Sequence, residues 1–242
     1  MRAMIFAAGL GTRLRPLTDD RPKALVRVAG DTLLGHTVRR LQAAGVDEFV
    51  INAHHFSQQI VDYLEASGNF GSNVRVSVEK DRPLETGGGI RHARPLLEGA
   101  GHFLVHNVDI ISNLDIGKMV SSCRPDALAT LLVSDRVTKR YLLFNSDLRL
   151  MGWTNVETGE VKSPFGDLNP DDCIKLAFGG VHYISDAVFP LMEGWPEYFS
   201  IIDFYLAAAA EHPIYGYVQE GLELIDVGKT AALGQAESYL TR

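Results

Sequence analysis

The chain has 242 residues, of which 46% are hydrophobic and 22% charged, a composition that predicts a packed globular fold of one large domain or two small ones. With 23 basic and 30 acidic residues the net charge is −7, and because the basic residues are scattered we expect no nucleic-acid partner. No stretch reaches the roughly 18–20 apolar residues of a membrane helix, and Cys123 and Cys173 form neither a disulfide framework nor a four-cysteine zinc site, which favours the cytoplasm.

The first half of the chain alternates short apolar strands with amphipathic helices. Strands are expected at 3–7, 47–52, 74–78 and 102–106, and helices at 32–44, 56–66 and 86–97. This order is typical of a mostly parallel sheet with helices on both faces, in which ligands bind at the carboxyl ends of the strands. The apolar start of the chain runs directly into a glycine loop, which disfavours a secretion signal.

After about residue 135 the pattern changes to short antiparallel pieces separated by turn residues. The expected elements are strands at 141–144, 148–153, 160–162 and 174–184, helices at 187–192 and 201–211, strands at 214–218 and 222–227, and a terminal helix from 230. The fold class is therefore α/β, Rossmann-like, with a three-layer α/β/α arrangement around a mostly parallel mixed sheet that both halves share.

The loop after the first strand has the features of an anion-binding site. Gly9 and Gly11 allow the backbone amides to turn inward toward a phosphate, although an ordinary tight turn uses glycines in the same way. Arg15 and Arg21 fit a solvated loop as well as a phosphate site, whereas Lys23, held between a proline and an apolar run, favours a functional role.

The run from Ala7 to Thr18, followed by Pro22-Lys23-Ala24-Leu25, resembles the signature of the sugar-1-phosphate nucleotidyltransferases. The similarity of layout extends to Ile225-Asp226-Val227-Gly228, and the segment 83–90 is most similar to the bacterial N-acetylmuramate-1-phosphate uridylyltransferases. The resemblance implies a single nucleotidyltransferase domain, 1–242, with a nucleotide-binding half at 1–135 and a sugar-binding half at 136–242.

The resemblance also implies a reaction in which a sugar 1-phosphate attacks the α-phosphorus of a nucleoside triphosphate and expels pyrophosphate. In that reaction Arg13 would hold the departing phosphates, Lys23 would stabilise charge on the α-phosphate, and Asp109 would be the third catalytic residue. Asp109 and Asp226 would hold Mg²⁺, whose preferred ligands are oxygens. A strand-end aspartate that caps a turn is the alternative for each of them.

Further contacts follow from the same resemblance. The nucleotide would contact Ala8, Gly9, Gly11, Thr12, Arg13, Lys23, Glu79, Glu85, Thr86 and Gly87, and the sugar phosphate would contact Asn107 and Gly180. Glycines 87–89 are expected to leave adjacent amides uncovered for a base, with Thr86 as a helix cap and Glu79 as a solvated residue in the alternative. Gly180 indicates close approach by a ligand or a simple bulge. Lys162 and Lys175 are candidates for the sugar phosphate, and Asp203 for sugar hydroxyls, unless solvated.

Three functional hypotheses remain. The preferred one is a Mg²⁺-dependent uridylyltransferase that uses UTP and N-acetylmuramate 1-phosphate, in the cytoplasm, for nucleotide-sugar biosynthesis and peptidoglycan recycling. A mannose-1-phosphate guanylyltransferase is the nearest alternative. A catalytically silent nucleotide-sugar sensor is the third, because Val108 stands where the family usually has glycine.

Overall fold

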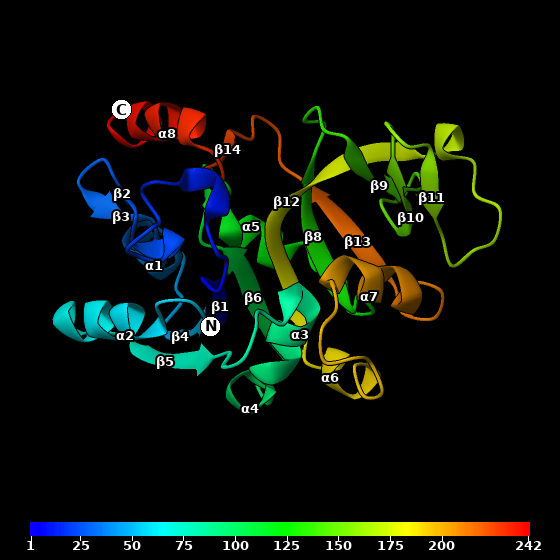
Figure 1. Ribbon diagram of the computed structural model, residues 1–242. Helices are drawn as coiled ribbons and strands as arrows, with labels where there is room; N and C mark the ends of the chain where they lie inside the picture. Colours follow the sequence, from blue (N-terminus) through cyan, green and yellow to red (C-terminus); the bar gives the residue numbers. More distant parts are fainter.

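The computed structural model describes residues 1–242 and contains one ten-stranded mixed sheet with helices on both faces (Figure 1). Four parallel strands come from the first half of the chain. In the order in which they lie side by side they are β6 (His102–Asn107), β1 (Arg2–Phe6), β4 (Glu48–Ala53) and β5 (Asn73–Val78). All four strands predicted in this half are confirmed, and the expected α/β class with it.

The second half extends the same sheet through the long strand β12 (Ile174–Ser185), which pairs antiparallel with β6. Residues 174–176 at its other end pair with β9, so β12 connects the parallel strands to an antiparallel extension. The remaining strands are β8 (Ala129–Ser134), β9 (Arg140–Phe144), β10 (Leu150–Asn155), β11 (Glu160–Lys162) and β13 (Ile214–Val218). Both halves therefore share one sheet, as expected.

The sequence pattern leaves residues 110–134 without a prediction, and the structure places three elements there. They are β7 (Ile110–Ser112), α5 (Ile116–Ser121) and β8. Strand β7 pairs with β14 (Leu224–Asp226), away from the main sheet, and a second small ladder joins β2 (Arg27–Val28) to β3 (Asp31–Thr32). Strand β8 is an almost continuous apolar run, and such a run has no periodicity that separates a buried strand from a buried helix.

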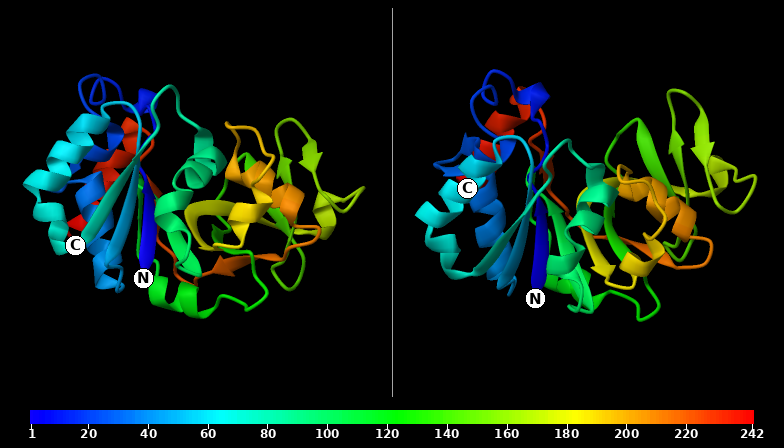
Figure 2. Two further views of the ribbon diagram at one scale, coloured as in Figure 1. Left: turned by 90° about the horizontal axis from the view of Figure 1, so that it is seen from below. Right: turned by 60° about the horizontal axis from the view of Figure 1, so that its bottom comes forward.

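The helices form two layers, one on each face of the sheet. One layer contains α1 (Leu33–Ala43), α2 (Ser57–Ala66), α5 and α8 (Leu233–Leu240); the other contains α3 (Glu85–His92), α4 (Arg94–Leu97), α6 (Val188–Leu191) and α7 (Ile201–Ala208). Figure 2 shows α1 and α2, in blue to cyan, on one side of the parallel strands and α3, in green, on the other. The helix predicted at 86–97 is split into α3 and α4, because Pro95 lacks an N–H and its ring clashes with the preceding turn.

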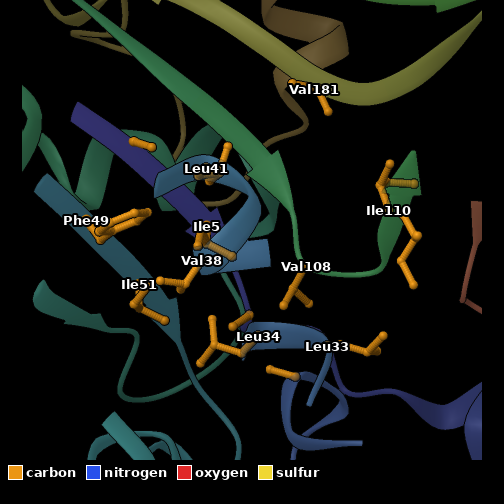
Figure 3. Packing of buried hydrophobic residues seen from close by; sticks show 14 of the residues in the cluster. Ile5, Leu33, Leu34, Val38, Leu41, Phe49, Ile51, Val108, Ile110 and Val181 are labelled. Carbon is orange, nitrogen blue, oxygen red and sulfur yellow. The ribbon is translucent and has the colours of Figure 1, made fainter. Parts of the chain in front are cut away.

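Strand residues alternate between two hydrophobic cores. In β1, Ala3 and Ile5 belong to the core beneath α1 and α2, whereas Met4 belongs to the core beneath α3 and α7. Figure 3 shows the first core, in which Val108 lies among residues of α1 such as Leu33. Both faces of the parallel strands are therefore buried, and only their ends reach the surface.

The helices are short, and the longest, α1, has 11 residues. None of them combines the length and the hydrophobicity that crossing a membrane requires.

Two histidines lie buried on neighbouring strands. His106 of β6 donates from Nδ1 to the carbonyl of Asn107 at 2.8 Å, and Nδ1 of His182 in β12 is hydrogen-bonded to the hydroxyl of Tyr205 at 2.6 Å. Burial disfavours the charged imidazolium and lowers the pKa of His106 to about 4 and the pKa of His182 to about 3.

We therefore expect the free energy of unfolding to be highest with respect to these histidines above about pH 6.5, where they are neutral in the unfolded chain as well. It should fall as the pH drops toward 4, because the unfolded chain then takes up protons that the folded protein does not. The variant His182→Gln keeps a hydrogen-bonding partner for Tyr205 but takes up no proton. Between about pH 7 and about pH 5 it should lose about 2 kcal/mol less than the wild type in urea titrations. An unchanged pH dependence would exclude His182 as a cause.

Candidate functional site

The carboxyl ends of β1, β4 and β6 meet the start of α3 around a cavity of about 230 Å³. This cavity, which we call the base cavity, lies at the carboxyl ends of the strands, where the sequence predicted a ligand site. Its walls are formed by Phe6, Ala7, Ala8, Gly9, Lys23, Asn52, Glu79, Pro83, Glu85, Thr86, Asn107, Val108 and Asp109. Eight of the residues predicted to contact a ligand or metal are among them.

A second cavity, of about 620 Å³, opens beside the glycine loop and shares Lys23 and Asp109 with the first. We call it the loop cavity. Residues 8–13 form one of its sides, and Gly228 lies on another. Gly11 has a φ of 65°, and a Cβ there would come within 2.9 Å of the Thr18 side chain. The turn therefore requires glycine at this position.

The basic residues of this loop differ in their surroundings. Arg13 lines the loop cavity. Arg15 pairs with Asp19 and Arg21 pairs with Asp20, both at the exposed surface, and neither arginine lines a cavity described here. The alternative interpretation, a solvated loop, fits Arg15 and Arg21.

Lys23 and Asp109 form a largely buried ion pair at the junction of the two cavities. Lys23 begins the short 3₁₀ turn Lys23–Leu25, and its Nζ donates to Oδ2 of Asp109. The two side chains retain only 10% and 19% of their exposure. The backbone carbonyl of Asp109 also accepts from the amide of Val227 at 2.8 Å, so this aspartate is fixed from two sides.

Asp226 lies next to this pair. It ends β14 and stands opposite Ile110, the residue after Asp109, in the β7–β14 ladder. A Cβ on Gly228 would come within 2.7 Å of Oδ1 of Asp226 and 2.9 Å of Nη2 of Arg13, so these opposite charges converge at that glycine. The fold thus brings Arg13, Asp109 and Asp226 together from segments far apart in the sequence.

The donor set fits a hard divalent cation. Asp109 and Asp226 place two carboxylates on adjacent backbones, and no group of three or more histidine, cysteine or acidic side chains is arranged to hold a metal ion. A dedicated protein cage is absent, whereas Mg²⁺ characteristically takes one or two carboxylates and completes its shell with water and substrate phosphates.

The glycines at the start of α3 serve packing. The amides of Gly87 and Gly88 both donate to the carbonyl of Phe199, at 2.9 and 3.2 Å, so the expectation that they are uncovered is wrong. A Cβ on Gly87 would come within 2.3 Å of the Phe199 ring, and Gly87 lines none of the cavities described here. Thr86 lines the base cavity, and its hydroxyl accepts from the amide of Ile201 at the start of α7; the alternative that it caps its own helix, α3, is wrong.

Glu79 is buried and not solvated, with 2% of its surface exposed. Its Oε1 accepts from Nδ2 of Asn52 at 2.7 Å, and its Oε2 accepts from the amide of Leu84 at 2.8 Å. Neighbouring Glu85 has a φ of 60°, an unusual value for a residue other than glycine, and its Oε1 accepts from the hydroxyl of Tyr198 at 2.6 Å.

The two residues predicted to contact the sugar phosphate lie side by side. Asn107 ends β6 and lines the base cavity. Gly180 has a φ of 73°, and a Cβ there would come within 3.0 Å of Nδ2 of Asn107. The pairing register shifts between Phe178 and His182, so the bulge interpretation of this glycine is confirmed.

A third cavity, of about 530 Å³, lies among the strands of the second half and α7, and it shares Glu85 with the other two. We call it the sheet cavity. Its charged wall residues are Glu85, Arg136, Arg140, Glu160, Lys162 and Asp203. Lys162 donates to Asp203 at 3.1 Å, whereas Lys175 pairs with Asp171 and does not line this cavity.

Sequence reasoning missed Asn52, Arg136 and Arg140. A polar residue that ends an otherwise apolar strand is a usable signal for Asn52, which follows Phe49-Val50-Ile51. The two arginines offered none, because they stand in a short polar segment that any surface turn resembles.

Comparison with known proteins identifies the family. The sequence profile of the nucleotidyl transferase family matches residues 2–141. The N-acetylmuramate alpha-1-phosphate uridylyltransferase of Caulobacter vibrioides is 36% identical over 98% of this chain and 96% of its own length. This chain belongs to the nucleotidyl transferase family.

Other relatives of this nucleotidyl transferase match a shorter stretch. The protein of the same name from Neisseria meningitidis is 48% identical over 48% of this chain and 49% of its own length. A mannose-1-phosphate guanylyltransferase of Arabidopsis thaliana is 35% identical over 50% of this chain and 34% of its own length.

Solved structures share the fold. HddC from Yersinia pseudotuberculosis, complexed with GMP-PN, has a TM-score of 0.76 at 23% identity over 99% of both chains. A UDP-glucose pyrophosphorylase complexed with UDP-glucose has a TM-score of 0.77 at 18% identity over 100% of this chain and 99% of its own. The Rossmann-like architecture expected from the sequence is thereby confirmed.

The two loop glycines should respond differently to a methyl group. Gly11→Ala forces a left-handed backbone onto alanine and crowds Thr18, so it should lower the free energy of unfolding by about 1–2 kcal/mol. Gly9→Ala is the matched control, because no atom lies within 4 Å of its Cβ position. Urea titration of both variants checks the contrast, and equal stabilities would contradict the geometry given for Gly11.

Proposed function

We propose that this nucleotidyl transferase transfers the uridylyl group of UTP to N-acetylmuramate 1-phosphate. A phosphate oxygen of the sugar forms a bond to the α-phosphorus, the bond from that phosphorus to the β-phosphate oxygen breaks, and pyrophosphate leaves with the electron pair. The observation that carries the proposal is the buried Lys23–Asp109 pair, which lies where the glycine loop meets the base cavity. The full-length similarity to the Caulobacter vibrioides uridylyltransferase supports the choice of substrates.

The nucleophile is already ionised, so the protein needs no general base and works by positioning and charge neutralisation. The loop cavity would receive the triphosphate, because residues 8–13 surround it and Arg13 faces it with a planar donor. Lys23 would stabilise negative charge that grows on the α-phosphate. Ala8, Gly9, Gly11 and Thr12 would approach the phosphates through their backbone.

Asp109 and Asp226 would hold Mg²⁺. The ion supplies neutralisation of phosphate charge and orientation of the two substrates when bound. Lys23 donates to one oxygen of Asp109, so lysine and ion would share a single carboxylate, and Arg13 lies near the other aspartate. Cytoplasmic nucleotide-sugar biosynthesis, with a place in peptidoglycan recycling, would follow from these substrates.

The proposed roles of Lys23 and Asp226 predict that one substitution lowers turnover and the other weakens Mg²⁺ binding. Lys23→Ala should lower kcat about a hundredfold or more, the scale of a lost donor to transition-state charge. Asp226→Asn should instead raise the Mg²⁺ concentration needed for half-maximal rate by about tenfold or more. Lys118→Ala, an exposed lysine on α5, is the control. Pyrophosphate release over a Mg²⁺ titration measures both, and near-normal kcat in Lys23→Ala would remove this lysine from the mechanism.

The sheet cavity offers a place for the sugar. Arg136 and Arg140 line it, and neither has a carboxylate within 4.0 Å, although the other cation there, Lys162, is paired. N-acetylmuramate differs from N-acetylglucosamine by a lactyl ether that carries a carboxylate, the group that an arginine fork binds best. Shared Glu85 connects this cavity to the base cavity and the loop cavity, so one substrate can lie in each.

These arginines make the sugar preference testable. The double variant Arg136→Ala/Arg140→Ala should lower kcat/KM for N-acetylmuramate 1-phosphate about tenfold or more and leave that for N-acetylglucosamine 1-phosphate within about twofold, since only the first sugar loses a charged partner. Lys139→Ala is the matched control on the same segment, because Lys139 pairs with Glu157 and lines no cavity described here. An equal loss for both sugars would contradict carboxylate recognition.

The same assay, run with UTP, GTP, CTP and ATP against both sugars and mannose 1-phosphate, tests the proposed function itself. Preference for GTP with mannose 1-phosphate would favour the guanylyltransferase hypothesis, to which the partial similarity to the Arabidopsis thaliana protein points. No pyrophosphate release with any pair would favour the silent sensor.

A further inference from the structure

Asn52 leaves one polar atom without a partner inside the wall of the base cavity. It lies near the end of β4, with none of its surface exposed. Its Nδ2 donates to Oε1 of Glu79 at 2.7 Å, but its Oδ1 has no hydrogen-bonding partner in the protein. A buried acceptor without a donor is destabilising, and Asn52 lines the base cavity, so a donor on a ligand bound there would satisfy it.

Glu79 determines which end of the Asn52 amide is free. A carboxylate offers only acceptors, and its Oε2 is already held by the amide of Leu84. The NH₂ of Asn52 must therefore face Oε1, and the carbonyl oxygen must face elsewhere. Gly89 of α3 leaves room for this arrangement, because a Cβ there would come within 2.8 Å of Oε1 of Glu79.

The place of the cavity limits its occupant. It shares Ala8, Gly9, Lys23 and Asp109 with the loop cavity, so a nucleotide whose phosphates lie in the loop cavity reaches the base cavity with its ribose and base. Phe6, Pro83 and Val108 supply apolar surface there. Asn52 and Glu79 are buried polar residues of this wall; each oxygen of Glu79 already accepts one hydrogen bond from the protein, whereas Oδ1 of Asn52 accepts none.

We propose that Oδ1 of Asn52 accepts the N3–H of uracil and that Glu79 is a positioning residue that keeps this acceptor turned toward the base. The inference rests on the proposed function and names the group that selects the base. Uracil presents a ring N–H at the place where cytosine presents an unprotonated ring nitrogen. An acceptor fixed in the wall thus favours UTP. It disfavours CTP, because Oδ1 of Asn52 and the unprotonated ring nitrogen of cytosine are both acceptors and cannot form a hydrogen bond.

The variant Glu79→Gln should exchange the acceptor that Asn52 presents to the base cavity for a donor. The amide N–H of Leu84 still needs an acceptor, so the carbonyl of the new amide faces Leu84 and its NH₂ faces Asn52. Asn52 then turns its oxygen toward that NH₂ and presents its own NH₂ to the cavity. The ratio of kcat/KM for CTP to that for UTP should rise at least about tenfold, a change of sign in recognition that mere loosening of the wall does not produce.

Asn52→Ala tests the acceptor directly. It should lower kcat/KM for UTP about tenfold or more, mainly through a higher KM for UTP, because the base is bound alike in the ground and transition states. Ser77→Ala is the matched control: Ser77 is buried on β5 in register with Asn52 and lines no cavity described here, so its KM values should not change. Thermal unfolding of each variant is measured alongside.

A test on the nucleotide needs no variant. The wild type should use 3-methyl-UTP, which lacks the N3–H, at least about a hundredfold less well than 5-methyl-UTP, which carries equal bulk but keeps it. Equal use of the two analogues, or an unchanged CTP to UTP ratio in folded Glu79→Gln, would overturn the inference. Wild-type preference for another nucleotide and sugar would instead overturn the proposed function, and the two failures are thus distinct.

Discussion

The ion pair between Lys23 and Asp109 is the contact that makes this chain's strand ends into a single site. It joins the turn that follows the glycine loop to the residue that follows β6, two segments that the sheet alone would leave independent. Removing either partner would leave a largely buried charge without compensation, which is far more destabilising than the pair itself is stabilising. The pair therefore fixes the loop in register with the strand ends, and such preorganisation would lower the cost of binding the proposed substrates.

The cavities are lined by positive side chains although the net charge of the chain is negative. The net charge of −7 repels polyanions at long range, yet Arg13 and Lys23 face the loop cavity, and Arg136 and Arg140 face the sheet cavity. Two aspartates beside the first pair keep its positive charge partly neutralised. A cation held by those aspartates would shift the balance toward phosphate, so the ion and the triphosphate would favour each other's binding through linkage.

The fold and much of the candidate site could be predicted from the sequence because their signals are local. Parallel strands show as apolar runs between helices, and the loop at 8–13 follows the first of them. Tertiary packing decided the rest. The glycines after Glu85 read as a bare ligand surface, but Phe199, more than a hundred residues away, covers Gly87 and Gly88. The role of Asn52 depends on an unpartnered oxygen, which only coordinates reveal.

A backbone amide determines which side-chain group the wall of the base cavity presents. The amide of Leu84 is a donor whatever residue occupies that position; it fixes one oxygen of Glu79, and the other oxygen fixes the NH₂ of Asn52. Each step follows from the fact that a buried donor needs an acceptor. The amide of Leu84 therefore determines, through Glu79, that Asn52 presents an acceptor to the proposed base. A change of base preference then requires a change in this chain of hydrogen bonds, since enlarging or reducing the cavity leaves the same acceptor in place. Glu79 is therefore the position at which a single substitution of equal size reverses what the wall presents.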